Sequence, residues 1–147
     1  MSVITFRQAA IATAMMAAVG AAQALTLNTS ALNANSTQAF SEDAVGAFEA
    51  YATTVEAAGT TTDAGNHKFV LPITKVVIGS SLKPTSGDVS GAALKFSRTN
   101  PTTGVTRSVY LANFRIDYTA GKVLADRAMI DATGAAVTEN IEIYTYE

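Results

Sequence analysis

The single histidine, His67, is the side chain best suited to chemistry near neutral pH. An imidazole titrates in that range and serves as a general base, a metal ligand or a haem ligand. His67 follows Asn66 at the start of a strand-like segment, and no G-x-S-x-G sequence offers the serine of a hydrolase triad. One histidine and no cysteine cannot form a multi-histidine or thiolate metal centre within one chain. We therefore predict that His67 is a surface loop residue.

Carboxylates in short turns are the second group with chemical potential. Asp63, Asp88 and Asp131 lie close to Gly or Thr, where carboxylate and carbonyl oxygens could bind calcium. Their spacing matches neither an EF-hand loop nor the glycine-rich calcium-binding nonapeptide, so we interpret them as ordinary turn residues. A hydrolase with paired carboxylates remains an alternative, because that pair is defined by a separation in space.

Tyrosines form the third group: Tyr110, Tyr118, Tyr144 and Tyr146. Together they could make an aromatic binding face or supply a haem ligand, but tyrosines on strands mainly pack and keep the hydroxyl tip polar. We predict no catalytic residue, no metal ligand and no cofactor, and we leave the residues of any cofactor site unassigned. Asn28 and Asn35 begin N-x-S/T sequons, which matter only in a host that glycosylates them.

The first 24 residues have the three-part layout of a secretory signal peptide. Arg7 is the only charged residue before Glu42, and an apolar run covers 9–22. That run is shorter than the roughly 20 residues needed to cross a bilayer. The segment from Ala22 to Ala24 has the small residues that signal peptidase accepts. We expect cleavage before Leu25 and secretion to the periplasm, the cell surface or the medium.

The exported segment, residues 25–147, has the size of one compact β-rich domain. The whole chain carries a net charge of −2, with both signs spread along it, which argues against a nucleic-acid or anionic-membrane partner. It has no second apolar stretch of about 18 residues, so we predict no membrane span in the mature chain. Because there is no cysteine, the fold must rest on its apolar core.

One helix is expected near the start of this domain, after a short strand at 25–27 and a loop over 28–38. Ser41 is suited to cap that helix, and two acidic residues follow it in the first turn. An apolar stripe at helical spacing from Val45 to Val55 then predicts a helix over 42–58 that ends at Gly59. A polar loop is expected over 60–66.

Strands are expected from Lys68 to Tyr146, because the apolar period changes to two and β-branched residues accumulate. We expect a break at Pro72 and a hairpin with a turn at Gly121. In the last strand, Ile143 and Tyr144 are expected on opposite faces. The predicted strands are 68–79, 92–98, 105–112, 114–118, 122–128 and 137–146, and the predicted turns are 80–91, 99–104, 119–121 and 131–134.

This pattern predicts a mainly β fold, an antiparallel β-sandwich or jelly-roll-like domain with one N-terminal helix after the signal peptide. A parallel β-solenoid is the alternative, because periodicity does not fix the order of the strands.

The segment from Gly91 to Met129 contains GAALKFSR and then RSVYLANFRIDYTAGKVLADRAM. It resembles the core of bacterial secreted HtaA-like domains, in which a Phe-centred strand precedes an L-x-N-x-x-I-D strand and a Gly turn leads into an Ala-Asp strand. That family binds haem through a tyrosine and a histidine, the latter in a Gly-His motif soon after the Phe. Here Ser97, Arg98 and Thr99 follow instead, so we assign no haem ligand. The matching residues are Phe96, Leu111, Asn113, Ile116, Asp117, Gly121, Ala125 and Asp126.

The sequence thus predicts a secreted, non-enzymatic structural or binding protein of the bacterial periplasm or cell surface. Its expected partners are further copies of itself or other cell-surface proteins, joined by strand addition at an exposed edge near Pro72 or at the C-terminal strand. The alternative is an HtaA-like carrier of haem or another small hydrophobic ligand.

Overall fold

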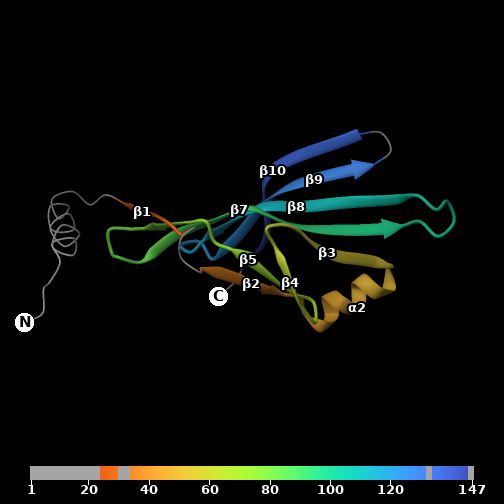
Figure 1. Ribbon diagram of the computed structural model, residues 1–147, viewed down its shortest axis with the longest axis horizontal. Coiled ribbons are helices and arrows are strands. Elements are labelled where there is room, and N and C mark those ends of the chain that lie inside the picture. The colour runs from red at the N-terminus through yellow and green to blue at the C-terminus, as the bar shows by residue number, and fades with distance from the viewer. Residues whose placement is uncertain (1–23, 30–33, 132–133, 146–147) are drawn as a thin grey trace, which may run out of the picture.

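Two antiparallel sheets and one short helix make up the described part of the chain (Figure 1). The computed structural model describes residues 24–29, 34–131 and 134–145. The predicted signal peptide therefore lies outside the described residues, apart from Ala24. No helix among the described residues is long and apolar enough to span a bilayer.

The larger sheet has seven strands, and β7 is its central strand. Along the main path the strands follow the order β1, β6, β7, β8, β9, β10. On the side of β7 away from β8, β6 pairs with the first half of β7 and β3 with the second half. The bounds are β1 (Leu25–Asn28), β3 (Thr53–Gly59), β6 (Lys75–Ile78), β7 (Pro84–Thr99), β8 (Thr106–Asp117), β9 (Lys122–Asp131) and β10 (Gly134–Thr145).

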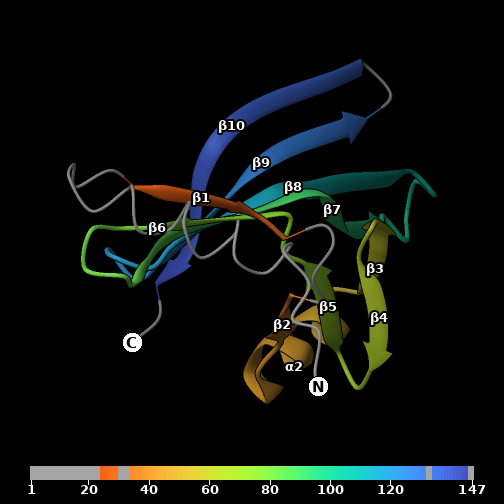
Figure 2. The ribbon, with the colours of Figure 1, turned by 60° about the vertical axis from the view of Figure 1, so that its left-hand side comes forward.

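The smaller, three-stranded sheet lies with the helix on one side of the larger sheet (Figure 2). Its strand order is β2 (Asn35–Ala39), β5 (Lys68–Pro72), β4 (Thr62–Gly65), and the helix is α2 (Glu42–Ala50). All strand pairs are antiparallel. The predicted mainly β, sandwich-like fold is confirmed, and the β-solenoid alternative is wrong.

The apolar core lies between the two sheets. Two of its residues come from β5 in the smaller sheet, and the others come from three neighbouring strands of the larger one. Burial of apolar surface here is the main source of stability in a chain without disulfides. The buried apolar residues are Phe69, Leu71, Val89, Ala92, Leu94, Phe114, Ile116, Val123 and Ala125.

The predicted helix is half as long as expected. Ser41 does cap it, accepting a hydrogen bond at 3.3 Å from the backbone N–H of Ala44. The helix ends at Ala50, however, and the expected second half is strand β3. Val55 packs against the core from this strand, where it fits an alternating pattern as well as a helical one. The period of the apolar residues was therefore ambiguous over this stretch.

Three segments predicted as loops or turns contain strands. The polar segment 28–38 includes most of β2, and 60–66 includes β4. Both strands flank β5 as edges of the smaller sheet, where polar side chains face solvent. The Gly-rich turn expected over 80–91 is mostly the first half of β7. There the ring of Tyr118 lies over Gly87, so the missing side chain leaves room for an aromatic one.

The remaining strands follow the prediction with two differences. The break after Pro72, the 99–104 turn and the hairpin through Gly121 are present. The strands expected at 105–112 and 114–118 are one strand, β8, with a bulge at Asn113. Ile143 packs against the core and Tyr144 lines a pocket beside it, so their predicted separation is wrong. A register shift between Glu142 and Tyr144 explains this. Tyr146 lies outside the described residues.

Candidate functional site

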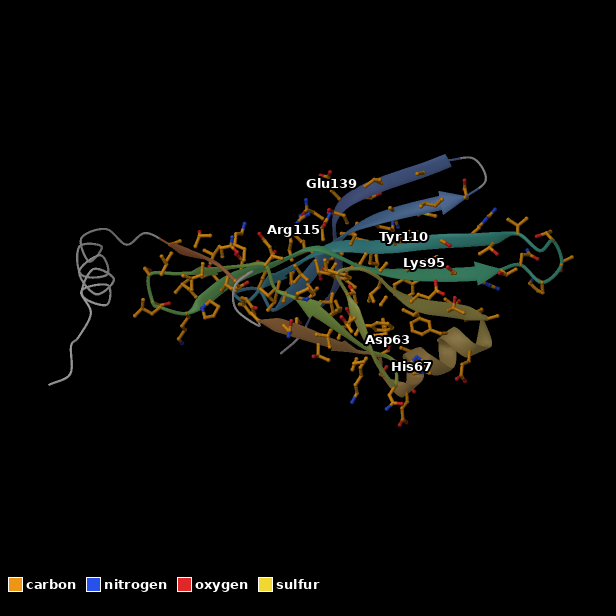
Figure 3. The ribbon with its side chains drawn as sticks, viewed as in Figure 1. Asp63, His67, Lys95, Tyr110, Arg115 and Glu139 are labelled. Atoms are coloured by element: carbon orange, nitrogen blue, oxygen red, sulfur yellow. The ribbon has the colours of Figure 1, made fainter. Side chains whose placement is uncertain are left out.

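His67 lies in an exposed turn at the tip of the smaller sheet, as predicted (Figure 3). Gly65 pairs with Lys68, so Asn66 and His67 form the turn between β4 and β5. Both turn residues have positive φ, 51° and 55°. The conformation fits a tight hairpin turn that matches the twist of the strands. The role of His67 in the fold is therefore that of a turn residue.

The three candidate aspartates are on separate elements. Asp63 accepts a hydrogen bond at 2.7 Å from the backbone N–H of Gly65, two residues on in the same turn region. Asp88 is inside β7, not in a turn as predicted, and pairs with Lys75. Asp131 ends β9. Among the described residues, no three His, Cys, Asp or Glu side chains gather as metal ligands would.

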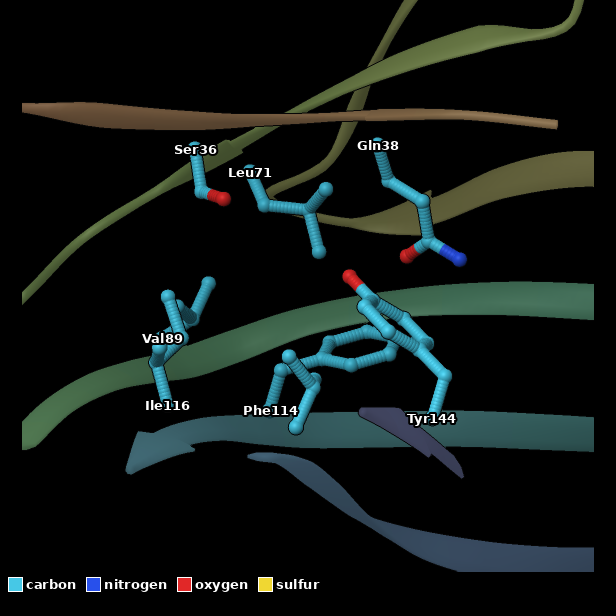
Figure 4. A pocket seen from close by; sticks show the side chains of 8 residues that line it. Ser36, Gln38, Leu71, Val89, Phe114, Ile116 and Tyr144 are labelled. Carbon is cyan, nitrogen blue, oxygen red and sulfur yellow. The ribbon is translucent and has the colours of Figure 1, made fainter. Parts of the chain in front are cut away.

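The tyrosines do not converge on one face. Tyr110 is opposite Lys95 on neighbouring strands of the larger sheet (Figure 3). Tyr144 lines a pocket between the two sheets, where it lies near Gln38 (Figure 4). The pocket has a volume of about 20 Å³, which is room for about one water molecule. A haem would require the two sheets to separate. The pocket is lined by Ser36, Gln38, Leu71, Val89, Phe114, Ile116, Val123 and Tyr144.

Two residues from the HtaA-like pattern, Asn113 and Asp126, meet in a polar network on the larger sheet. The amide nitrogen Nδ2 of Asn113 donates to Oδ2 of Asp126 at 3.1 Å. The other carboxylate oxygen, Oδ1, accepts from Nη2 of Arg115 at 2.8 Å and from the backbone N–H of Asn140 at 3.1 Å. Oδ1 of Asn113 in turn accepts from the backbone N–H of Gly91 at 3.1 Å.

This network joins β-bulges on three strands. The register shifts near Gly91 in β7, near Asn113 in β8 and near Asn140 in β10, and all three residues have positive φ. Asp126, on the regular strand β9, is their shared partner through direct or linked hydrogen bonds. We call these four residues the bulge line. Bulges bend a sheet and increase its twist, so the bulge line separates the larger sheet into two halves.

Electrostatics favour the charged form of Asp126. Burial raises the pKa of this carboxyl group, but the hydrogen bonds from Asn140 and Asn113 and the positive charge of Arg115 lower it by more. The net effect places the pKa of Asp126 below its ordinary value. The carboxylate thus serves as a fixed acceptor for the bulge line, which is a structural role.

The other residues of the pattern also have places in the sheet. Asp117 accepts hydrogen bonds from the backbone N–H groups of Thr119 and Ala120 at 2.9 and 2.8 Å, and Gly121 completes that turn with a φ of 62°. Ile116 and Ala125 are buried, and Phe96 and Leu111 pack against the core.

Comparisons with family models, curated proteins and solved structures found no significant match to this chain.

The ends of β9 and β10 beyond the bulge line are apolar on both faces. Met129 and Ile130 are neighbours on β9, so their side chains point to opposite faces of the sheet. They are 45% and 46% exposed, respectively. Val137, across from Ala128, is 65% exposed. This hairpin end projects away from the smaller sheet and the helix (Figures 1 and 2). Exposed apolar side chains on both faces of a projecting ribbon are unusual for a soluble monomer.

The outer edge of β10 is unpaired among the described residues, because β10 pairs only with β9. The strand has 12 residues, no Lys and no Pro. Its charged residues are Glu139 and Glu142, and Glu142 pairs with Lys122 at 2.8 Å. Residues 134–138, beyond the bulge line, carry no charge at all. The only sequence signal for this exposed apolar hairpin end is the apolar composition of 128–137. That composition indicates two apolar faces only once the strand register is known.

Proposed function

We propose that this protein is an exported, non-enzymatic structural protein of the bacterial periplasm or cell surface that associates with copies of itself by strand addition at β10. The observation that carries the proposal is the β9–β10 hairpin end, where apolar side chains on both faces accompany an edge that has no charge over 134–138 and no partner strand among the described residues. Soluble proteins usually protect such edges with lysine, proline or a covering loop.

The opposite side of the same sheet offers a suitable partner edge. In the part of the chain that the structure describes, β1 pairs only with β6 and β3 only with β7. β3 has a single charged residue, Glu56, which is neutralised by Lys95 at 3.0 Å. β1 is exposed along its length, with Leu25 53% and Leu27 39% exposed. Joining β10 of one copy to this side of the next is a head-to-tail contact, which can repeat from copy to copy.

The non-enzymatic part of the proposal is supported by the placement of the side chains that catalysis would need, which do not gather at one site among the described residues. The chain has no cysteine, and its one histidine is in an exposed turn. The candidate aspartates lie on separate elements, and the pocket between the sheets holds about one water. These features support a role for surfaces and edges over one for a catalytic cleft.

The test compares Val137→Lys with Ala47→Lys in the protein purified from an exporting host. Both substitutions add one charge at an exposed apolar residue, but Ala47 is in α2, outside both sheets. Light scattering after size exclusion should give a mass that rises with concentration for the parent and for Ala47→Lys. Val137→Lys should stay monomeric, since a buried lysine at the contact would lack a partner.

Two outcomes would contradict the proposal. The first is a parent protein that stays strictly monomeric at high concentration. The second is a loss of association of the same size in both variants, because that would assign the effect to added charge anywhere on the surface.

A further inference from the structure

The β7–β8 hairpin brings two arginines together near its tip. Arg98 and Arg107 are direct partners in the register, so their side chains leave the sheet on the same face. Like charges directly opposite each other on neighbouring strands are destabilising. The arrangement therefore lowers stability unless another interaction offsets the repulsion.

Four other cations of the larger sheet show the usual compensation. Lys75 pairs with Asp88, and Lys95 with Glu56. Arg115 pairs with Asp126 at 2.8 Å, and Lys122 with Glu142 at 2.8 Å. Within the described part of the chain, neither Arg98 nor Arg107 has a carboxylate at ion-pair distance. Arg127 in β9 also has no carboxylate at ion-pair distance among the described residues and lies near the hydroxyl of Thr138 instead. The hairpin tip differs because two such arginines are placed directly opposite each other.

One of the two guanidinium groups is held in place from the side. The Cζ atom of Arg98 lies 5.3 Å from the centre of the Tyr51 ring, at the C-terminal end of α2. An aromatic ring over a guanidinium is a favourable cation–π contact, and it leaves the N–H groups at the edge of the plane free to donate.

The loop beside the arginines is built by its own hydrogen bonds. Oδ1 of Asn100 accepts from the backbone N–H groups of Thr102 and Thr103 at 2.9 and 3.1 Å. The backbone N–H of Asn100 donates to the carbonyl of Val105 at 2.9 Å. An open hollow of about 550 Å³ lies here, and we call it the arginine hollow. It is lined by Arg98, Asn100, Pro101, Thr103, Val105 and Arg107.

We propose that the arginine hollow binds an oxyanion, a phosphate or carboxylate group presented by a larger molecule outside the cell. Each guanidinium can donate two parallel hydrogen bonds to such a group, and its negative charge removes the repulsion between the two arginines. The hollow is open and lies at a projecting tip, which suits a group carried on a polymer. This site does not depend on the self-association proposed above.

The test is an NMR titration of the ¹⁵N-labelled protein from an exporting host, with inorganic phosphate in one series and acetate in another. Ionic strength is held constant with chloride, because exposed charge pairs weaken as salt rises. Saturable shifts are expected in the amides of 98–107 and in the Nε–H groups of Arg98 and Arg107. The series with the tighter binding identifies the favoured group.

Two variants decide whether the arginines act as a site. Arg107→Gln should weaken binding at least tenfold. Lys83→Gln removes the same charge from the exposed β6–β7 turn and should change the affinity less than twofold. In chloride alone, the melting temperature of Arg107→Gln should be no lower than that of the parent, because the like-charge pair is gone. Added phosphate should raise the melting temperature of the parent but not that of Arg107→Gln.

The proposal fails if the shifts do not saturate for either anion. It also fails if they spread equally over other basic residues, or if Lys83→Gln weakens binding as much as Arg107→Gln. Each of these results would mean that the tip attracts anions only through general charge.

Discussion

Asp126 holds together parts of three strands through one side chain. Its carboxylate accepts hydrogen bonds from Asn113, Arg115 and the backbone of Asn140. Asp126→Ala would leave these donors without their acceptor, and we expect a loss of about 2–3 kcal/mol in the free energy of unfolding. Asp63→Ala, which removes an exposed carboxylate with one local hydrogen bond, should cost less than about 1 kcal/mol. Urea unfolding of both variants measures the difference.

The pH dependence of stability should also report on Asp126. Its pKa is lower in the folded protein than in the unfolded chain, so its contribution is fully present above the unfolded value of about 3.9. The contribution is lost as the pH falls through the lower, folded pKa. Asp126→Asn should flatten the decline in stability below about pH 4, when unfolding is followed from pH 6 to pH 2. An unchanged acid limb would contradict the role assigned to this carboxylate.

The turn at His67 gives a test of the structural role of that histidine. His67→Ala should unfold within about 0.5 kcal/mol of the parent, because an exposed turn side chain contributes little. His67→Gly should be more stable by about 0.5–1 kcal/mol, since glycine adopts the positive φ of 55° without strain. Thermal unfolding measures both. Titration with haemin distinguishes a turn residue from a haem ligand. A Soret shift in the parent that His67→Ala abolishes would favour the haem-carrier alternative.

At the scale of elements, α2 depends on aromatic contacts. Nine residues are too few for a stable isolated helix, and α2 has no buried residue. Phe48 packs edge-to-face on Phe40 and Phe96, with ring centres 5.2 and 5.9 Å apart. Phe48→Ala should therefore cost about 2 kcal/mol and speed hydrogen exchange in the α2 amides, whereas the exposed Glu49→Ala should leave both unchanged.

Sequence patterns predicted those elements whose periodicity is unambiguous. The hairpin through Gly121 and the strand at 92–98 were predicted because their alternation is regular. The helix was made too long because Val55 satisfies both periods, and β8 was divided at Asn113 because a bulge interrupts alternation as a loop does. Three features depend on cross-strand register, which a single sequence does not specify. They are the bulge line, the arginine hollow and the end of the β9–β10 hairpin that is apolar on both faces.

At the scale of the whole molecule, the two free sides of the larger sheet are different, and this makes the proposed growth directional. Val137→Lys alters the β10 edge and leaves the β1 and β3 side intact, so it should join the end of a growing assembly and stop it there. A small fraction of Val137→Lys added to the parent should thus shorten the assemblies seen by sedimentation velocity. If two β10 edges pair with each other instead, the same addition should have little effect on the parent.

The bulge line also determines where the chain tolerates changes in length. The bulge at Asn113 adds one residue to β8 relative to β9, so the side chains that follow it point to the opposite face from the one simple alternation would give. The register shift in β7 adds two residues relative to β8. Removal of Asn113 alone would turn Phe114 and Ile116 away from the core, as a frameshift alters every codon after it. A residue removed from the exposed loop at 100–104 leaves that phase intact. Natural length variation in such a sheet should therefore collect in the turns and avoid the middle of its long strands.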